Sequence, residues 1–582
     1  MKSLLKYLKA YRKESIIAPL FKMLEASFEL FVPLVMASII DVGIKNHDVT
    51  YILKMGGVLV LLGIVGLSCS LTAQYFSAKA ATGFGTALRN DLFAHVNKFS
   101  YTEIDTVGTA TLITRLTSDT NQVQSGVNLF LRLFLRSPFI VFGAMIMAFT
   151  VNVKAAMVFV VTIPLLSIVV FGIMVISMPL YKKVQKQLDQ VMKNTRENLA
   201  GVRVIRAFNR QNDEVKVYDQ DSDLLVKFQV FVGKISALMN PITYIMVNGA
   251  IIVIIWVGGK QVDSGIITQG EVVALVNYMS QILVELVKLA NLIVTISKSL
   301  ACANRVEGIF KIQPSITNKN DVGNATVGAE NDAAKVEFQH MTFLYAGSKE
   351  PSLEDITFRA EKGQTIGIIG GTGSGKSTLV NMIPRFYDVS QGTVLVDGTD
   401  VRDYQLETLR GKIGVVPQRA VLFKGTLRDN MKWGRKDATD EEIQRALEIA
   451  QAADFVAEKN QGLDLMIQES GNNLSGGQRQ RLTIARALVK RPEILIMDDS
   501  ASALDFATDA RLRKAIREGT ENMTVFIVSQ RATTVKQADQ ILVLDDGKLV
   551  GCGTHRELID SCEVYKEICL SQLSKEEVEQ NV

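Results

Sequence analysis

This 582-residue chain has few cysteines and little net charge, and each of these features argues against a class of protein. Its five cysteines are scattered without metal-ligand spacing, so they predict neither a metal site nor a disulfide framework. The formal net charge is only +4, which gives no reason to expect nucleic-acid binding. The N-terminus, MKSLLKYLKAYRK, is basic and amphipathic but lacks a cleavage site of small residues. We interpret it as a cytoplasmic helix lying on a membrane, not as a signal peptide.

Apolar sequence is abundant and unevenly distributed. Hydrophobic residues make up 48% of the chain, and the mean hydropathy is positive. Repeated apolar stretches fill residues 14–300, whereas the second half has the pattern of a soluble α/β domain. The sequence therefore predicts four regions: a transmembrane domain over residues 1–310, a polar, turn-rich linker over 311–334, an α/β domain over 335–570, and a polar tail over 571–582.

Six stretches are long and apolar enough to cross a bilayer. They are Ile16–Ile40 and the regions near residues 55–78, 127–151, 155–178, 237–258 and 272–295. An even number puts both termini on one side, and the basic residues of the connection 180–236 predict that this side is the cytoplasm. That connection and residues 79–126 have helical periodicity, so we expect the spans to continue as long helices beyond the bilayer.

The first span contains three charged residues, Lys22, Glu25 and Glu29, spaced so that they share one helix face. Charges inside a span normally face a bundle interior or an aqueous cavity. One interpretation is that Glu25 and Glu29 attract a cationic substrate; the other is that Lys22 pairs with Glu25 while Glu29 lines a wet cavity. Four aromatic or pliable residues of other spans would suit a hydrophobic cation, or would simply pack: Phe139, Met145, Tyr244 and Met246.

A complete phosphate-loop pattern begins the chemistry of the second half. A strand ending at Gly370 leads into GGTGSGKST, and an apolar helix follows. Glycines let backbone amides close around phosphates, and the helix N-terminus adds partial positive charge. We expect Lys376 to reach the β and γ phosphates and Ser377 to ligate magnesium. The predicted ATP-binding residues here are Gly370, Gly371, Thr372, Gly373, Ser374, Gly375, Lys376, Ser377 and Thr378.

Three weaker elements follow in order. A strand that ends near Gln418 presents an amide able to contact magnesium or an attacking water. The segment NLSGGQRQ opens a strongly helical run, and Ser475 can cap that helix. The apolar run ILIM ends in Asp498, directly followed by Asp499. Such a run is typical of a strand buried on both faces, and its terminal acid would lie where a magnesium–phosphate group binds.

Together these motifs resemble those of the ATP-binding cassette (ABC) exporters. Over nearly its whole length the chain resembles a half-transporter, with six transmembrane helices of the type IV exporter kind fused to an α/β nucleotide-binding domain. The resemblance implies ATP and Mg2+ as cofactors, with Ser377, Gln418 and Asp498 at the metal and Tyr345 stacked on adenine. It also implies two ATP molecules held between two cassettes. The residues that would contact the partner's ATP are Leu474, Ser475, Gly476, Gly477, Gln478 and Asp505.

By the same resemblance, two segments correspond to coupling helices, Tyr101–Asp105 and Val204–Glu214, and the second would dock on the opposite cassette. Two catalytic positions depart from the family's pattern. Asp499 stands where the family has a glutamate, and Gln530 stands where it has a histidine. A carboxylate drawn back by roughly an ångström can cost on the order of a hundredfold in rate. Glutamine can donate a hydrogen bond but cannot carry the proton that histidine carries.

These departures predict that the ATP site at this chain's own phosphate loop is degenerate. The LSGGQ segment, which corresponds to the family's signature motif, is intact. The chain therefore resembles one subunit of the bacterial heterodimeric multidrug exporters. We expect ATP-driven export of small hydrophobic or amphipathic compounds across the cell membrane. The expected partners are a second, non-identical half-transporter, the lipid bilayer and a small-molecule substrate, with no nucleic acid. The alternatives are a homodimer with two slow sites, a lipid or peptide exporter, and an ATP-gated channel or regulator.

Overall fold

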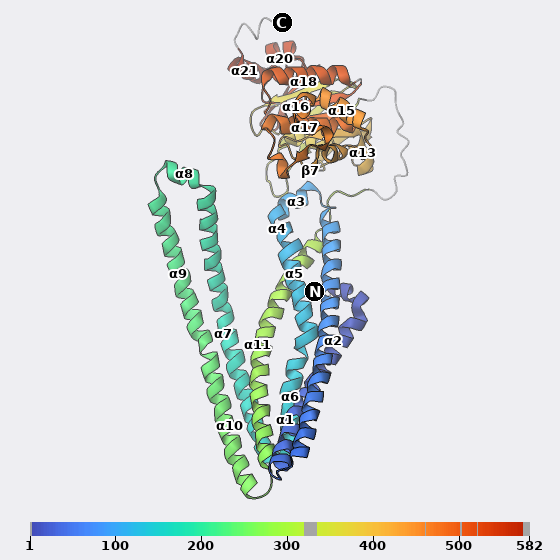
Figure 1. Cartoon of the computed structure of the whole chain (residues 1–582). Coiled ribbons are helices and arrows are strands. Elements are labelled where there is room, and N and C mark those ends of the chain that lie inside the picture. Colours follow the sequence, from blue (N-terminus) through green and yellow to red (C-terminus); the bar gives the residue numbers. More distant parts are fainter. Residues whose placement is uncertain (1–2, 319–333, 460, 501–502, 521, 574–582) are drawn as a thin grey trace. The chain divides into compact units, whose positions relative to one another are not determined.

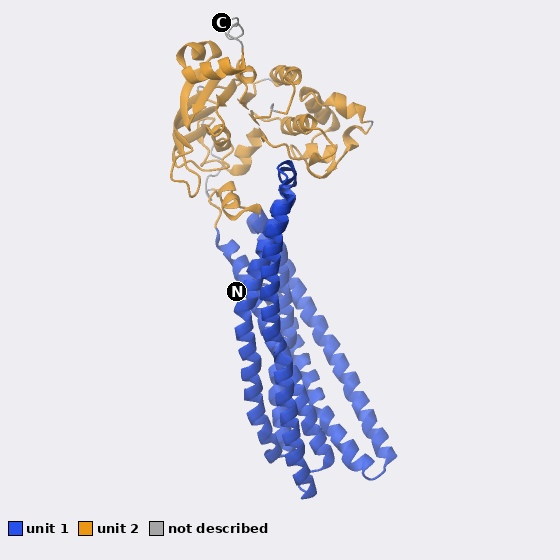
Figure 2. Ribbon diagram, turned by 90° about the vertical axis from the view of Figure 1, so that its left-hand side faces the viewer, with its two compact units in different colours: residues 1–97, 110–312 blue, residues 98–109, 313–582 orange. Residues whose placement is uncertain are grey.

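The computed structural model describes residues 3–318, 334–459, 461–500, 503–520 and 522–573. The chain divides into two compact units, shown in blue and orange in Figure 2. The first comprises Met1–Asn97 with Ala110–Ile312, and the second comprises Lys98–Thr109 with Gln313–Val582. Most of the expected linker and the end of the expected tail lie outside the described residues, so their boundaries stay predictions.

In the part of the chain that the structure describes, six helical segments are long and apolar enough to cross a membrane, which confirms the six predicted spans. They are Leu4–Ile44, Val49–Val96, Thr109–Val151, Val153–Ala200, Gln211–Asp263 and Gln269–Lys311. A helix of 48 residues rises about 72 Å at 1.5 Å per residue. The hydrocarbon core of a bilayer is only about 30 Å thick, so these helices are long enough to extend well beyond it.

The helices of the first unit are η1 (Leu4–Tyr11), α1 (Arg12–Ser38), η2 (Ile39–Ile44), α2 (Val49–Val96), α4 (Thr109–Thr114), η3 (Arg115–Asp119), α5 (Thr120–Leu129), η4 (Phe130–Phe134), α6 (Arg136–Val151), α7 (Val153–Ala200), α8 (Val202–Ala207), α9 (Gln211–Ala237), α10 (Met239–Asp263) and α11 (Gln269–Lys311). Figure 1 shows α7 and α9 side by side, with α8 joining their ends. Pro164 and Pro179 lie inside α7 without ending it.

Small residues allow the spans to pack closely. Ala26, Ala144 and Ala274 are fully buried in the core formed by α1, α6, α7, α10 and α11. Small side chains let helix backbones approach each other closely within a membrane, where the hydrophobic effect does not drive helices together. The hydroxyl of Tyr278 on α11 donates to the carbonyl of Leu30 on α1, at 2.7 Å. This buried hydrogen bond fixes the two helices to each other.

The second unit contains one helix that precedes the rest of it in sequence, α3 (Tyr101–Val107). A reciprocal capping box between Ser100 and Glu103 starts this helix, and Glu103 also accepts from the backbone amide of Ser315 at 3.2 Å. The Tyr387 hydroxyl donates to Asp105 at 2.8 Å. These contacts build α3 into the same folded unit as the C-terminal part of the chain.

A six-stranded sheet organises this unit, with strand order β12-β11-β3-β10-β9-β6. All neighbouring pairs are parallel except β11 with β12. Every residue of β9 and β10 is buried, as expected for strands covered on both faces. The strands are β3 (Thr365–Gly370), β6 (Ile413–Val416), β9 (Ile494–Asp498), β10 (Thr524–Val528), β11 (Gln540–Asp545) and β12 (Lys548–Gly553).

A second sheet is antiparallel, with order β2-β1-β4-β5. Its strands are β1 (Val336–Phe343), β2 (Leu353–Ala360), β4 (Gln391–Val396) and β5 (Thr399–Asp400). A charge network ties the two sheets: Lys335 contacts Asp397 (2.7 Å) and Glu493, and Lys412 donates to Asp397 at 2.5 Å. Burial raises the pKa of Asp397, but hydrogen bonds from the two lysines outweigh it and hold that pKa below its ordinary value.

Candidate functional site

The phosphate loop connects β3 to α12 (Lys376–Met382). Gly375 has φ +93°, and a Cβ there would lie 2.9 Å from the carbonyl oxygen of Ser352, so this turn requires glycine. The ammonium group of Lys376 donates to the carbonyl oxygens of Gly370 (3.0 Å) and Gly371 (2.5 Å). Burial lowers the pKa of Lys376, although Asp499 and Asp498 oppose the shift. The loop therefore holds a buried cation against its own backbone.

Ser377 and Asp498 meet at the carboxyl edge of the sheet. The Ser377 hydroxyl donates to a carboxylate oxygen of Asp498 at 2.8 Å, joining the start of α12 to the end of β9. Burial raises the pKa of Asp498, and the neighbouring Asp499 adds to this, while Ser377 and Lys376 oppose it. A nearby cation would favour the ionised acid.

This pair of oxygen ligands fits magnesium, a hard cation that keeps several waters and takes phosphate oxygens. Among the described residues, no group of three or more His, Cys, Asp or Glu side chains could hold a metal by itself. Besides Gln418, the third residue predicted at the metal, the remaining ligands would be nucleotide and water oxygens. When bound, magnesium would bring positive charge to the phosphate groups.

Asp499 lies beside this pair in a left-handed backbone conformation, with φ +43°. Few residues other than glycine adopt this region without cost, and aspartate is among those that tolerate it. The Asp499 amide donates to the carbonyl of Val528 at 3.0 Å, and its carboxylate accepts from Gln418 at 3.5 Å, a long hydrogen bond. Burial raises its pKa; Gln418, Lys376 and Arg531 oppose the shift.

Gln530, the other departure, is exposed and follows β10 by two residues. Its backbone carbonyl accepts from the side chain of Gln572 at 2.8 Å. The carboxyl ends of β10 and β9 are adjacent because the two strands pair in parallel. Asp499 and Gln530 therefore follow neighbouring strand ends.

Tyr345 follows β1 and lies against the helix of the phosphate loop. Its hydroxyl hydrogen-bonds with that of Thr378 at 2.9 Å, and its ring meets Phe343 and Tyr387 edge-on. This position beside the loop is consistent with contact to a nucleotide base.

The LSGGQ segment begins α17 (Gly476–Val489). Ser475 accepts from the amide of Gln478, and the Gln478 side chain accepts from the amide of Ser475, which confirms the predicted cap. Leu474 packs into the core around α17, whereas the apolar residues of α12 pack into the core on the other sheet face. Asp505 caps the next helix, α18 (Phe506–Gly519), by accepting from Thr508. Residues 501 and 502, just before it, lie outside the described residues.

Within the first unit, Lys22 and Glu25 form an ion pair of 2.6 Å, as one interpretation of their spacing predicts. Glu29 is also paired, with Arg136 at 2.6 Å. Arg136 in turn contacts the deeply buried Glu285 at 2.7 Å. Arg136 and Glu285 were not predicted from the sequence, although each is a charge inside an expected span and so marks a functional candidate.

A cavity of about 450 Å³ lies between α1, α6 and α11. Of the four aromatic or pliable residues suggested for a hydrophobic cation, and of Glu25, none lines this cavity in the described part of the chain. Phe139, Met145 and Met246 pack against the helix core, and Tyr244 is exposed. The residues that line the cavity include Glu29, Ile140, Asn277, Gln281, Glu285 and Lys288.

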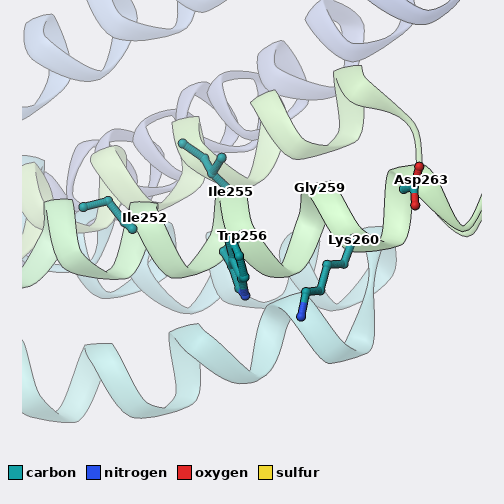
Figure 3. Close-up of a pocket in the computed structure, with 6 residues that line it drawn as sticks. All are labelled: Ile252, Ile255, Trp256, Gly259, Lys260 and Asp263. Atoms are coloured by element: carbon teal, nitrogen blue, oxygen red, sulfur yellow. The ribbon is translucent and has the colours of Figure 1, made fainter.

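A second hollow, of about 480 Å³, is lined by residues of α10 near the end of that helix. Figure 3 shows Trp256 and Lys260 on the same side of the helix, and the ammonium group lies 5.0 Å from the indole centroid. Tryptophan and lysine near a span end are typical of the membrane–water boundary. We assign this hollow to the lipid boundary.

Two family models match the chain: the ABC transporter transmembrane region matches residues 15–286, and the ABC transporter model matches residues 353–502. An uncharacterized ABC transporter ATP-binding protein of Mycobacterium tuberculosis is 36% identical over 571 residues, covering 97% of each chain. The ATP-dependent lipid A-core flippase of Desulfotalea psychrophila is 34% identical, covering 81% of each. A Bacillus subtilis protein named for multidrug export, YgaD, is 31% identical, covering 98% of each.

A solved structure of a bacterial Atm1-family ABC exporter with ATP bound has the same fold, with a TM-score of 0.80. It covers 97% of this chain and 99% of its own, at 23% identity. The predicted fold class is thus confirmed: six membrane-spanning helices joined to a nucleotide-binding domain.

Proposed function

Because this chain belongs to the ABC transporter family, as an exporter with its membrane region fused to its ATP-binding domain, we propose that it is one half of a heterodimeric exporter of small hydrophobic or amphipathic compounds. The family's ATP-binding domain couples ATP hydrolysis to transport. The observation that supports a heterodimer is the residue Asp499, whose carboxylate is shorter than the family's glutamate and follows Asp498 directly, together with Gln530.

At this chain's own phosphate loop, Lys376 would bind the β and γ phosphates, and Ser377 and Asp498 would hold magnesium. Asp499 is one methylene too short to polarise an attacking water efficiently, and Gln530 cannot take its proton. ATP therefore binds here and turns over slowly or not at all. The cassette closes on ATP, and hydrolysis proceeds mainly at the other site.

That other site is completed by the LSGGQ residues of this chain. Ser475 and the amides at the start of α17 face the γ phosphate of ATP held by a partner that carries the glutamate and histidine. Support comes from the separate packing of Leu474 and α12 in two cores on opposite sheet faces, which suits a motif that serves another chain's nucleotide.

Both termini and the cassette lie in the cytoplasm in this proposal, because basic residues concentrate in the long connection 180–236. The multi-pass membrane location itself follows from the six spans and the family.

The test is the ATPase activity of this chain purified alone in lipid. We expect turnover near background, and restoration when the partner half-transporter is added. The double variant Asp499→Glu with Gln530→His should raise the activity of the chain alone at least tenfold. Brisk turnover by the unmodified chain without a partner would refute the heterodimer.

Lipid export is the second candidate, because a relative 34% identical is named as a lipid A-core flippase. Proteoliposomes with fluorescent lipid in one leaflet discriminate the two. ATP-dependent lipid transfer without drug transport would favour the lipid function.

A further inference from the structure

The membrane unit contains a linear chain of four alternating charges: Glu29, Arg136, Glu285 and Lys288. Successive members are 2.6, 2.7 and 2.9 Å apart. This row of charges runs from α1 through the start of α6 to α11, so each helix contributes at least one charge. Its formal charge sums to zero.

The two inner members, Arg136 and Glu285, are buried. The side chains of Arg136 and Glu285 are only 10% and 4% exposed. Glu285 accepts from Arg136 and Lys288 through one oxygen and from the hydroxyl of Ser137 through the other. These hydrogen bonds occupy both carboxylate oxygens, so Glu285 serves to hold its neighbours in place.

The two end members are open. The side chain of Glu29 is 42% exposed and that of Lys288 is 55% exposed, and both line the 450 Å³ cavity. Arg136 engages one oxygen of Glu29, and Glu285 engages the Lys288 ammonium group, which has three donors. A carboxylate and an ammonium group thus face one cavity, and each can form further hydrogen bonds in addition to those within the charge network.

The rest of the cavity is amphipathic. Apolar side chains such as Ile140 and Val284 line it, together with the amide of Gln281, whose oxygen is buried and lacks a hydrogen-bond partner among the described residues. Its volume is within the range of small-molecule sites. An occupant therefore needs an apolar body and polar groups of both signs.

We propose that this cavity binds a small zwitterionic amphiphile, its cationic group on Glu29 and its anionic group on Lys288. The inference rests on the proposed export function and names the class of substrate. A purely cationic compound fits less well, because Lys288 would repel it and the four charges give no net attraction. A purely anionic compound meets the same difficulty at Glu29.

Equilibrium dialysis of the full chain in nanodiscs tests this without ATP hydrolysis. The probes are three forms of one dipeptide: phenylalanyl-leucine, its C-terminal amide and its N-acetyl derivative. They share an apolar body and carry both charges, only the positive charge, or only the negative charge. We expect the zwitterion to bind about tenfold more tightly than either singly charged form.

The variants assign each end. Glu29→Gln should remove the preference for the zwitterion over the N-acetyl form, and Lys288→Gln the preference over the amide. The matched controls, Glu25→Gln on α1 and Lys298→Gln on α11, should bind like the unmodified chain, because neither residue lines the cavity. Glu29→Asp, which keeps the carboxylate, should retain the preference. Equal affinity for the three forms, binding of none, or variants without these selective losses would overturn the proposal.

Competition experiments distinguish the two possible sources of the zwitterion, a lipid head group and a soluble compound. Displacement of the dipeptide by lysophosphatidylethanolamine but not lysophosphatidylglycerol supports a lipid head group as the zwitterion. No displacement by either, with dipeptide selectivity intact, supports a soluble zwitterion. Because the readout is binding, a failed heterodimer proposal would leave this result unaffected.

Discussion

The two units hold buried charges in opposite ways. In the membrane unit, Arg136 lies between two carboxylates, and every inner charge has an opposite neighbour within 2.9 Å. In the second unit, Asp498 and Asp499 stand side by side while Lys376 is turned toward backbone carbonyls. Burial raises the pKa of both acids. The paired charges of the membrane unit position helices, whereas the acids and the lysine of the phosphate-loop site suit a cation and a phosphate.

Breaking the paired charges of the membrane unit should have the largest effect. Arg136→Met would leave Glu285 buried with only Lys288 and Ser137, and we expect a loss of about 3 kcal/mol in unfolding free energy. Thermal unfolding of the full chain in detergent measures it.

The double variant Arg136→Met with Glu285→Leu is its control. It replaces the pair by apolar residues and should recover most of the loss. A single variant as stable as the unmodified chain, or a double variant no better than the single, would contradict the interpretation that these paired charges position helices.

Breaking the phosphate-loop site should mainly weaken ATP binding. Lys376→Ala removes a buried cation from the phosphate loop, and we expect ATP affinity at this site to fall about 50-fold. Binding of a fluorescent ATP analogue to the chain alone measures it, with exposed Lys362→Ala on the same unit as the control. Unchanged affinity would show that the loop does not hold the phosphates.

The network of Lys335, Asp397 and Lys412 shows that the second unit also contains paired charges. The pKa of Asp397 in the folded protein lies below its ordinary value. Its contribution to the free energy of unfolding is therefore complete at any pH above the ordinary pKa and is lost as pH falls through the folded pKa. Asp397→Asn should cost about 1–2 kcal/mol at neutral pH and nearly nothing under strongly acidic conditions. Unfolding followed across pH measures this difference; a pH-independent cost would contradict it.

The smallest effect should come from the degenerate acid. Asp499→Ala in the assembled pair should slow transport by about twofold or less, because hydrolysis takes place at the site that the partner completes. ATPase and substrate flux of the reconstituted heterodimer measure it. Loss of all ATPase activity would place catalysis at Asp499.

The sequence predicted the six spans, the parallel sheet and the capped LSGGQ helix, because each depends on local pattern. Lys22 and Glu25 were also predictable as a pair, since they lie three positions apart on one helix. The bridge from Arg136 to Glu285 was not, because it joins residues 149 positions apart. The sequence shows only that each is an unexpected charge in a span, and which partner it meets depends on helix packing.

The chain crosses between the two units three times, after Asn97, after Thr109 and after Ile312. Residues 98–109 belong to the second unit through Tyr387–Asp105 and Glu103–Ser315. A C-terminal fragment that begins at Gln313 would therefore lack part of its own folded unit, and the N-terminal fragment would carry that part.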